Sequence, residues 1–503
     1  MDTSSYWIDS APIKSFPKLQ SNLSVSVLVV GAGVTGITTA YLLKQAGVRV
    51  ALIERERVAS IDTGHTTAHL TYVTDATLGQ LVRNIGRDHG QAVWDAGAAA
   101  IDEIERIVAA EQIDCEFSRV PGFLHVSIFG EGSKDDRSEL KEEADLAQQL
   151  GFDANFLESI PQFKVPGVRF ADQAKFHPRK YLGRLLKKID DDGSTVFERS
   201  AAEEFDSEKG RAKVNGHWIT FDRLVLATNN PLVGFSSMTS ATLFQTKLSL
   251  YSSYVIGAKV PRGSLPVALF WDTVDPYYYL RVDRLDDFDY AVFGGEDYKT
   301  GQRADTEHRY SRLEEKLKKV VPMAEVDHHW SGQVIETNDG LPYIGQNADR
   351  QFIATGYGGN GITFSTISAM MARDWVIGRK NPWSELFNVD RKMLKHGAWD
   401  YLRENADYPY YMIKDRLARA EAESVRGLKS GDGMIVKSGG KKVAAYRDSH
   451  EKVHKVSAVC THMGCLVRWN SAERTWDCPC HGSRFKTNGD VISGPAEEPL
   501  APA

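Results

Sequence analysis

Cysteine is scarce in this chain, which holds only five cysteines among 503 residues. Small secreted domains that depend on disulfides are much richer in cysteine. Four of the five lie between residues 460 and 480, and Cys115 stands alone. The scarcity excludes a disulfide-rich secreted scaffold and directs attention to one short C-terminal segment.

Long hydrophobic runs are also lacking. The stretch from Leu19 to Leu43 carries no charge, but serine, threonine and glycine dilute it, and its apolar core covers only residues 25–30. A core this short suits a strand, whereas a membrane-spanning helix needs about 20 apolar residues. We therefore expect no transmembrane segment, no targeting peptide and a cytoplasmic location, with peripheral contact to a membrane left open.

Neither sign of charge dominates, since 61 Lys and Arg are balanced by 67 Asp and Glu, for a net charge of −6. Proteins that bind nucleic acid usually carry a basic face, so this balance gives no reason to expect such a partner. The chain has 42% hydrophobic residues and no repeat or low-complexity tract. Its length predicts roughly two to four globular domains.

The C-terminal cysteines belong to two short segments that also contain histidine. Cys460 and His462 lie in the first, and after a gap of fifteen residues Cys478 and His481 lie in the second. Two thiolates and two imidazoles are the ligands of a Rieske [2Fe–2S] centre. Cysteine and histidine also suit tetrahedral zinc, which is the competing interpretation, although zinc motifs rarely interleave them in this way. The spacing therefore favours these four residues as iron ligands.

Both segments closely resemble those of the Rieske family. In many members the second cysteines of the two segments form a disulfide that clamps the cluster-binding loops, which implies a Cys465–Cys480 pair here. Members also donate hydrogen bonds to the cluster from a serine, which is Ser483 here, and from a tyrosine, where this chain has Phe485. Residues 493–496 resemble the proline-containing loop that covers the cluster.

The N-terminal part contains a complete βαβ pattern. A buried-strand run precedes Gly31-Ala-Gly33-Val-Thr-Gly36, a helical stretch follows, and a second strand ends in Glu54. The glycines permit a tight turn beside a pyrophosphate, the helix N-terminus faces the phosphates, and the acid can accept hydrogen bonds from a ribose. We therefore predict a dinucleotide site, with a purely structural βαβ unit as the alternative.

Four segments resemble the D-amino-acid-oxidase-type flavoprotein family, namely residues 63–69, 222–228, 339–345 and 355–363. The resemblance spans roughly residues 24 to 385 and implies FAD, bound without a covalent link. The last segment also reads as G-x-G-x-x-G, but no βαβ unit with a later acid follows it, so an NAD(P)H site is the weaker interpretation. The expected FAD contacts are Gly31, Ala32, Gly33, Val34, Thr35, Gly36, Glu54, Arg55, Gly64, Thr66, Thr67, Thr228, Gly340, Gly356, Gly358, Gly359, Gly361, Ile362 and Thr363.

Residues 275–282 predict one wall of a substrate site. Period-two alternation places Tyr277, Tyr279 and Arg281 on one strand face. Such a face above a flavin could bind a carboxylate and exclude water, and a solvated strand face is the plainer alternative. By the family resemblance, His69 lies in the loop that approaches the flavin ring. We predict Tyr279, Arg281 and His69 as catalytic residues.

The expected architecture has three parts. Residues 24–400 form an α/β FAD-binding Rossmann-like domain, with an inserted antiparallel-sheet substrate domain (α+β) at roughly 240–335. Residues 401–426 are a linker, and residues 427–503 form a small all-β Rieske domain. A domain this small depends on its cluster for much of its stability.

A flavin and a Rieske centre on one chain have a chemical logic, because a flavin accepts an electron pair and the cluster carries single electrons. With the family resemblance, this predicts an FAD-dependent dehydrogenase acting on a C–N bond of an amine or N-substituted amino compound. Electrons would pass through the cluster to an external quinone or electron-carrier protein near His462 and His481. Amino-acid oxidases often carry an Arg-Pro pair where this chain has residues 330–335, which argues against a simple α-amino acid as substrate.

Three other functions stay open. A reductase would pass electrons from NAD(P)H to a partner oxygenase, but only one strong dinucleotide motif is present. A Rieske oxygenase would need a mononuclear iron bound by two histidines and a carboxylate, and its Rieske domain generally comes first. A non-enzymatic redox sensor would show no turnover with any donor.

Overall fold

The computed structural model describes residues 3–130, 133, 135–191, 193–206, 209–230, 244–303, 305–391, 422 and 424–503. Of the predicted linker, residues 401–426, only 422 and 424–426 fall within this part. Among the described residues, no helix is long and apolar enough to cross a membrane. The chain begins with a short helix, α1 (Tyr6–Ser10).

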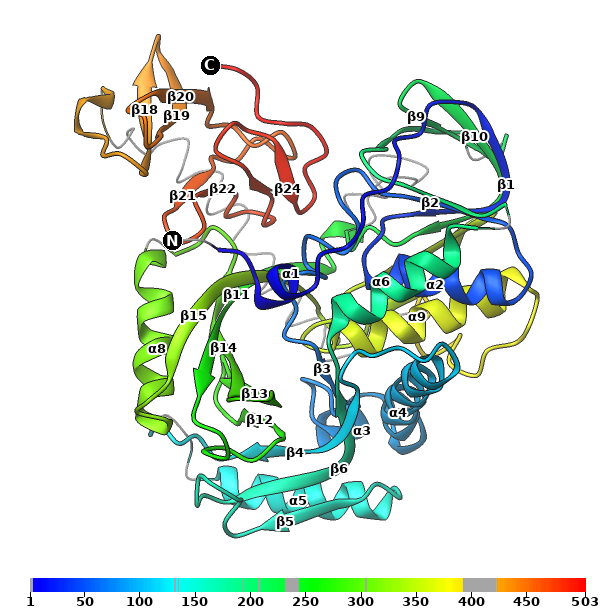
Figure 1. The fold of residues 1–503 in the computed structure, drawn as a ribbon, viewed down its shortest axis with the longest axis vertical. Coiled ribbons are helices and arrows are strands. Elements are labelled where there is room, and N and C mark those ends of the chain that lie inside the picture. The colour runs from blue at the N-terminus through cyan, green and yellow to red at the C-terminus, as the bar shows by residue number, and fades with distance from the viewer. Residues whose placement is uncertain are drawn as a thin grey trace.

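A mostly parallel sheet and its helices form one side of the molecule (Figure 1). Its strands are β1 (Leu23–Val30), β2 (Val50–Ile53), β7 (Thr195–Phe197), β8 (Ala202–Asp206), β9 (Arg211–Val214), β10 (His217–Leu226), β16 (Tyr343–Ala348) and β17 (Gln351–Thr355), and its helices are α2 (Val34–Gln45), α4 (Arg87–Ala110), α6 (Pro178–Ile189) and α9 (Gly361–Val376). The order is β16-β17-β10-β1-β2-β7, with the β8–β9 hairpin attached to β10. All of β2 and the end of β1 are buried, as is typical of parallel strands covered by helices. The predicted βαβ unit is present as β1, α2 and β2.

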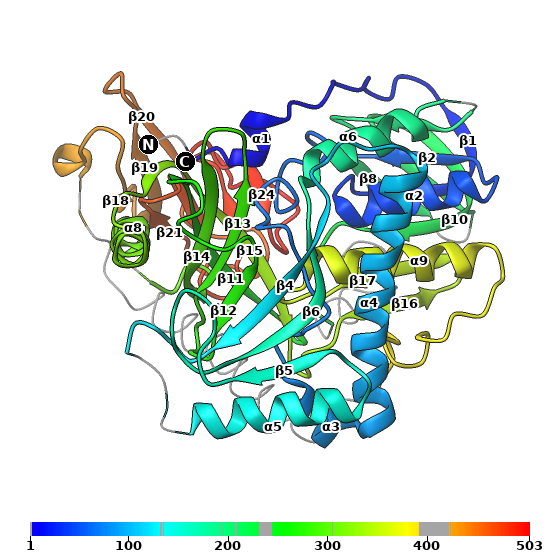
Figure 2. The ribbon, with the colours of Figure 1, turned by 60° about the horizontal axis from the view of Figure 1, so that its bottom comes forward.

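A second, larger sheet lies beside the first. Its strands are β3 (His69–Leu70), β4 (Ser118–His125), β5 (Ala154–Leu157), β6 (Gly167–Lys175), β11 (Leu248–Val260), β12 (Leu269–Asp272), β13 (Tyr279–Arg284), β14 (Asp289–Lys299) and β15 (Glu325–Thr337), and its helices are α3 (Leu78–Ile85), α5 (Asp136–Gln149), α8 (Arg309–Val320) and a 3-10 turn at Thr306–His308. The order is β15-β11-β14-β13-β12-β4-β6-β3, with β5 paired to β6. Figure 2 shows α5 beside β5 and α8 at the opposite edge. The predicted range 240–335 supplies β11 to β14 and most of β15, and earlier strands join because β12 pairs with β4.

The C-terminal part is a small all-β domain. It contains a 3-10 turn at Val425–Gly427 and strands β18 (Gly433–Ser438), β19 (Lys441–Arg447), β20 (Val453–Ser457), β21 (Arg468–Asn470), β22 (Thr475–Asp477), β23 (Arg484–Phe485) and β24 (Val491–Ser493). The first three strands form one antiparallel sheet and the last four another. Trp476 and Phe485 pack in its core with the buried Cys460 and Cys478. Together the three parts have the predicted fold class.

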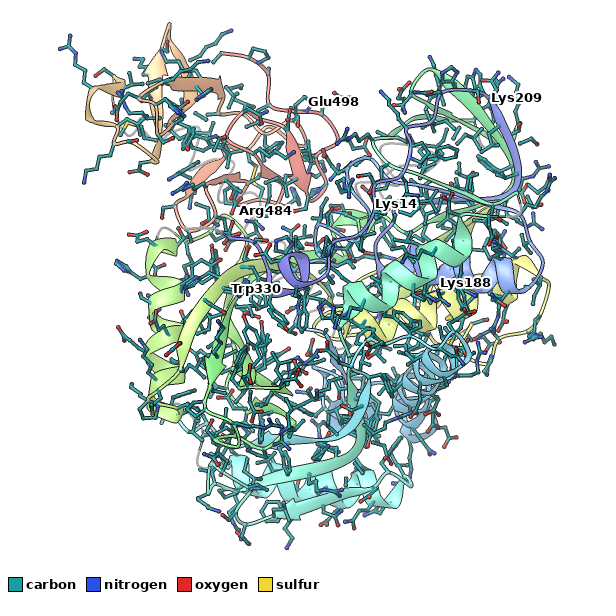
Figure 3. All side chains as sticks on the ribbon, viewed as in Figure 1. Lys14, Lys188, Lys209, Trp330, Arg484 and Glu498 are labelled. Atoms are coloured by element: carbon teal, nitrogen blue, oxygen red, sulfur yellow. A yellow bond between two sulfur atoms is a disulfide. The ribbon has the colours of Figure 1, made fainter. Side chains whose placement is uncertain are left out.

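The C-terminal domain packs against the larger sheet through polar contacts. The side-chain amide of Asn470 donates to the Tyr254 hydroxyl (3.2 Å), and the N–H of Ser471 donates to the Thr306 hydroxyl (3.1 Å). In Figure 3, Arg484 lies where this domain meets the part of the larger sheet that carries Trp330. Arg484 is buried and pairs with Asp477 of its own domain (3.3 Å). Hydrogen bonds therefore fix the orientation of this domain.

Candidate active site and cluster site

A cavity of about 1410 Å³ lies between the two sheets, and all three parts of the chain line it. The loop after β1 and the end of β2 form one end, and β11, β13 and β14 form the other. Residues 492–498 of the C-terminal domain line a further side. Sites for single small ligands usually measure roughly 300–1,000 Å³, so this cavity has room for a large cofactor together with a substrate.

The turn after β1 leaves no room for side chains at two of its glycines. Gly31 has a φ of +98°, and a Cβ there would lie 2.5 Å from the carbonyl oxygen of Ala227. A Cβ on Gly36 would lie 1.8 Å from the carbonyl oxygen of Gly31. This close packing brings the first N–H groups of α2 to the cavity wall, where a phosphate is favoured.

Glu54 lies at the end of β2 and lines the same end of the cavity. One of its carboxylate oxygens accepts a hydrogen bond from the N–H of Ala32 and the other from the N–H of Glu56, each at 2.9 Å. Burial raises the pKa of Glu54, and the two hydrogen bonds oppose that shift. Each carboxylate oxygen can accept more than one hydrogen bond, so Glu54 can also accept ribose hydroxyls.

The N-terminal segment holds the loop that follows β2. The indole N–H of Trp7 donates to the carbonyl oxygen of Thr66 (2.6 Å), and the hydroxyl of Ser5 donates to that of Gly64. Thr66 and Thr67 line the cavity, whereas Gly64 packs behind the loop. The buried Trp7 therefore supports the loop from the side that faces away from the cavity.

The N-terminus of α9 forms a facing wall. The N–H of Gly359 donates to the carboxylate of Asp75 (2.6 Å). The N–H groups of a first helical turn have no partner within the helix, so those at Gly361 and Ile362 can stabilise negative charge in the cavity. Thr363 points away and donates to the carbonyl oxygen of Thr71 (3.0 Å), which ties the helix to the neighbouring loop.

Most of the predicted FAD contacts share this cavity. Those that line it are Gly31, Ala32, Gly33, Val34, Thr35, Glu54, Arg55, Thr66, Thr67, Thr228, Gly340, Gly356, Gly358, Gly359, Gly361 and Ile362. Gly36, Gly64 and Thr363 lie behind the wall, where they shape the turns that carry it. Their contacts with FAD stay predictions.

Thr228 lines the cavity after β10, and Asn229 follows it. Asn229 has a φ of +63°, in the left-handed region that asparagine tolerates better than most residues. Its side-chain amide donates to the carboxylate of Asp62 (2.9 Å). Asparagine therefore suits the backbone conformation of this turn.

Hydroxyl and carboxyl groups gather at the opposite end of the cavity. The Tyr277 hydroxyl donates to Asp75 (3.0 Å), and the hydroxyls of Tyr279 and Ser253 share a hydrogen bond of 2.7 Å. Asp297 on β14 lines the same end and hydrogen-bonds Ser253. Burial raises the pKa of Asp297 to about 7 and also raises the pKa of Asp75.

Arg281 does not line this cavity, so its predicted role in binding a substrate carboxylate is corrected. Its side chain is fully buried, and the guanidinium donates to the carbonyl oxygens of Ala68 (2.7 Å) and Phe176 (2.8 Å) and pairs with Asp283 (2.9 Å). Alternation identifies the strand face correctly, but the chain at Ala68 covers that face at Arg281. The guanidinium supports the predicted flavin loop from behind.

His69 lines the cavity, with its ring edge-on to that of Tyr279 and 5.7 Å between ring centroids. Its Nδ1 lies 3.1 Å from the Thr67 hydroxyl. Burial lowers the pKa of His69 to about 3, so the ring is neutral at physiological pH. The predicted catalytic roles of His69 and Tyr279 stay predictions.

Among the residues of this cavity that sequence reasoning missed are Asp75, Asp297 and Gln333. Asp75 lies in a loop without a motif. Asp297 lies on β14, in which almost every residue is buried, and a carboxyl in such a strand is the signal that could have marked it. Gln333 lies within the segment that departs from the amino-acid oxidase pattern.

The four predicted cluster ligands converge between two loops of the C-terminal domain. The thiol of Cys460 is in hydrogen-bond contact with that of Cys478, and both residues are buried. The rings of His462 and His481 meet edge to face, with 4.9 Å between their centroids. A pair of sulfurs beside a pair of imidazoles is the donor set of a Rieske centre, and the residues fit it.

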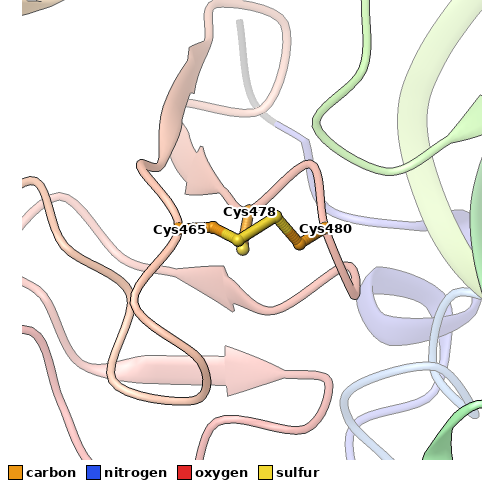
Figure 4. A group of neighbouring side chains, drawn as sticks. All are labelled: Cys465, Cys478 and Cys480. Atoms are coloured by element: carbon orange, nitrogen blue, oxygen red, sulfur yellow. A yellow bond between two sulfur atoms is a disulfide. The ribbon is translucent and has the colours of Figure 1, made fainter. Parts of the chain in front are cut away.

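Cys465 and Cys480 form a disulfide, which confirms the pairing implied by the Rieske resemblance. Figure 4 shows this disulfide next to Cys478. The three sulfurs lie within 4.8 Å of one another. Because a disulfide sulfur is not a thiolate, only Cys478 of this group is available as a ligand.

Residues behind the ligands also match the predicted cluster surroundings. Ser483 is fully buried, and its hydroxyl contacts the Cys460 thiol and accepts a hydrogen bond from the N–H of Ala496 (3.0 Å). Ala496 ends the predicted covering loop, residues 493–496, and this loop also lines the cavity. Phe485 is fully buried and offers no hydroxyl.

Gln333 on β15 connects the cavity with a cluster-binding loop. It lines the cavity, and its side-chain amide donates to the carbonyl oxygen of Gly482 (2.7 Å), the residue after His481. Its own N–H donates to Asp62 of the loop that follows β2 (3.3 Å). One residue therefore spans from the wall of the cavity to the loop that carries a predicted iron ligand.

Comparison with known proteins matches both parts of the chain. A family model described as FAD dependent oxidoreductase matches residues 26–375, and one described as Rieske [2Fe-2S] domain matches residues 419–502. The chain is 32% identical to the Rieske 2Fe-2S iron-sulfur protein YhfW of Bacillus subtilis (strain 168) over 507 residues, 98% of this chain and 96% of that one. It is 42% identical to the cytochrome b6-f complex iron-sulfur subunit 1 of a Nostoc species over 77 residues, 15% of this chain and 38% of that subunit. Glycine oxidase from Geobacillus kaustophilus aligns with a TM-score of 0.61 at 16% identity, over 74% of this chain and 99% of that structure, and supports the fold.

Proposed function

This chain belongs to the FAD-dependent oxidoreductase family and carries a C-terminal Rieske domain, and we propose that it is a dehydrogenase of an amine or N-substituted amino compound. Its cofactors are FAD and a Rieske [2Fe–2S] cluster. Electrons from the substrate pass through both to an external acceptor. The domain bounds are proposed as 24–400, 401–426 and 427–503.

The residues of the cavity suit FAD. The turn from Gly31 to Thr35 would hold the pyrophosphate, Glu54 the ribose, and the N-terminus of α9 the ring. When bound, FAD accepts a hydride from a C–H bond next to nitrogen and supplies electrons one at a time to a cluster. The close packing at Gly31 and Gly36 supports the assignment, since a Cβ at either position would clash with a backbone carbonyl oxygen and disturb the turn.

The chain's own groups at the far end of the cavity suit a nitrogen compound. Tyr277 and Tyr279 can enclose the substrate and exclude water, with hydroxyls already positioned by Asp75 and Ser253. Glycine oxidase, whose fold this chain shares, acts on an amino compound by its name. Oxidation of a C–N bond is therefore the reaction class that we propose.

The observation that carries the electron route is that the cluster-covering loop, residues 493–496, also lines the cavity. Arg55 at the nucleotide end donates to the carbonyl oxygen of Ile492 beside this loop (2.6 Å). Gln333 adds a second connection through Gly482. Both contacts hold the cluster site close to the cavity.

The external acceptor would bind near His462 and His481. Both rings are partly exposed, whereas the two predicted cysteine ligands are buried. A quinone or an electron-carrier protein could approach the histidine side of the cluster. Reoxidation of the reduced protein by a quinone or by a carrier protein would identify the acceptor.

The test is anaerobic mixing of the purified protein with amines, N-methyl amino acids, NADH and NADPH. Flavin bleaching would be followed by absorbance and the reduced cluster by electron paramagnetic resonance. We expect an amine to reduce both centres. Reduction by NADH or NADPH alone would replace the proposal with a reductase, and the absence of reduction by any donor would favour a redox sensor.

A further inference from the structure

The end of the cavity that faces β11, β13 and β14 is acidic. Asp297 and Asp75 both line it, together with the aromatic rings of Tyr277, Tyr279 and Trp271. One carboxylate oxygen of Asp297, Oδ1, is buried without a hydrogen-bond partner among the described residues. An oxygen in this state is suited to a ligand that donates a hydrogen bond or carries positive charge.

The charged groups that surround Asp297 make its environment more negative. The groups that act on its carboxyl include three other acids, Asp75, Asp275 and Glu296. Asp75 accepts hydrogen bonds from the N–H of Gly359 and the Tyr277 hydroxyl, and neither donor is a cation. Asp75 and Asp297 therefore have hydroxyl and N–H partners rather than an ion pair, whereas Glu296 pairs with Arg309 (2.9 Å) and Arg312 (2.8 Å).

The basic side chains that line the described cavity are Arg55, Arg57, His65, His69 and Arg83. Arg55 and Arg57 flank the nucleotide end near Glu54, and Arg83 on α3 acts on the buried Glu143. Arg281 is behind the wall, and His69 is neutral because burial lowers its pKa to about 3. No basic side chain of the described residues is among the groups that act on the carboxyls of Asp75 and Asp297.

We propose that Asp297 and Asp75, with the rings of Tyr277 and Tyr279, form a subsite for a substituted ammonium group, so that the substrate is a cationic amine without a carboxylate. An ammonium group would pair with the uncompensated carboxylate and lie against aromatic faces, both of which are favourable. A carboxylate in the same place would meet two acids without a cation. The assignment deepens the proposed function and rests on it for the reaction, but binding can be tested without turnover.

The test is isothermal titration calorimetry on the FAD- and cluster-loaded protein at pH 8 with three probes of similar shape. Benzyltrimethylammonium carries a permanent positive charge, phenylacetate a negative charge, and benzyl alcohol none. We expect the natural protein to bind the cation at least about tenfold more tightly than either of the other probes. Equal or tighter binding of phenylacetate would overturn the assignment.

The matched variants are Asp297→Asn and Asp349→Asn, which remove the same charge at different places. Asp349 is 93% exposed and lies outside the cavity, so its variant should bind the cation as the natural protein does. Asp297→Asn should weaken cation binding at least about tenfold, with bound FAD and circular dichroism unchanged. Equal affinity in both variants would overturn the assignment.

Asp75→Asn is a second test of the same subsite and should also weaken binding of the cation. If either variant loses FAD, the preference of the natural protein for the cationic probe over the other two decides whether the subsite exists. Cation binding without reduction by any amine would uphold the subsite and refute the proposed dehydrogenase. Reduction of the protein by an amine, with no preference for the cationic probe, would refute the subsite and uphold the proposed dehydrogenase.

Discussion

At the scale of single residues, the tightest constraint on the site is the space at Gly31. Alanine there would adopt a φ of +98° with its Cβ 2.5 Å from the carbonyl oxygen of Ala227. We expect Gly31→Ala to lose FAD and to lower the free energy of unfolding by about 2–5 kcal/mol, because backbone strain and a steric clash add. Bound flavin per chain and urea unfolding would measure both effects.

The control is Gly47→Ala, since Gly47 has a φ of +79° but a Cβ there would meet nothing within 4 Å. This variant should retain FAD and lose only about 1 kcal/mol from backbone strain. Full FAD occupancy in Gly31→Ala would contradict the assignment of this turn to the pyrophosphate.

Asp297 leads to a prediction about pH. Burial raises the pKa of its carboxyl from 3.8 to about 7. Since the folded-state pKa is the higher one, the neutral carboxyl contributes stability fully below about pH 4, and this contribution is lost as pH rises through about 7. The free energy of unfolding of Asp297→Asn, relative to the natural protein, should therefore rise by about 3 kcal/mol from pH 5 to pH 8.

Urea unfolding of both proteins at the two pH values measures this difference. The groups that face Asp297 are the same in both proteins, so their contributions to the difference in unfolding free energy cancel to first order. These groups are Asp75, Asp275, Glu296, Ser253 and Tyr279. A difference between the two proteins that does not change with pH would show that Asp297 titrates at its ordinary value.

Residue patterns predicted the cluster site better than the substrate end of the cavity. Ligand residues and turn glycines are set by local chemistry, so Cys460 and Gly31 could be identified from spacing alone. Arg281 and Asp297 could not, because their roles depend on which distant segment covers each strand face. Arg281 meets the chain at Ala68, whereas Asp297 meets open cavity.

At the scale of elements, the short helix α1 supports the loop that follows β2. Trp7 is fully buried and donates its indole N–H to the carbonyl oxygen of Thr66 (2.6 Å). We expect Trp7→Ala to lower the free energy of unfolding by about 3–5 kcal/mol through lost packing. It should also weaken FAD binding, because Thr66 and Thr67 line the cavity.

Trp7→Phe separates packing from hydrogen bonding, since it keeps a large ring but removes the N–H donor. It should cost about 1–3 kcal/mol, the penalty for an unsatisfied carbonyl, and weaken FAD less than alanine does. Flavin release during urea titration would measure both. Equal FAD affinity in all three proteins would mean that α1 does not support the cofactor loop.

Elements with local signals were predicted, and their long-range pairing was not. The βαβ unit of β1, α2 and β2 follows from periodicity and glycine placement within a short stretch. The larger sheet joins β4 to β12, strands separated by more than a hundred residues, and no local pattern encodes that pairing. The predicted range 240–335 therefore contains only part of that sheet.

At the scale of the whole molecule, the C-terminal domain completes the cavity rather than standing apart from it. Residues 493–496 are both the predicted cover of the cluster and a wall of the cavity. This arrangement could not be read from the sequence, because it depends on side-chain contacts between segments far apart in the chain. Hydrogen bonds such as that of Gln333 hold the cluster site beside the larger sheet.

Gln333 therefore offers a test of electron transfer between the two sites. Its amide donates to the carbonyl oxygen of Gly482 (2.7 Å), and Gln302 donates to Pro479 of the same loop (3.1 Å) without lining the cavity. Losing a hydrogen bond of about 1 kcal/mol shifts the population of the docked loop about fivefold. We expect Gln333→Ala to slow reduction of the cluster about fivefold after flash photoreduction of the flavin, without changing FAD content.

Gln302→Ala removes a comparable hydrogen bond from the same loop and serves as the control. If Gln333 matters because it joins the loop to the cavity wall, its variant should slow cluster reduction more than the Gln302 variant does. Equal slowing would mean that loop docking alone sets the rate. Unchanged rates in both variants would show that the route from the cavity to the cluster does not depend on this contact.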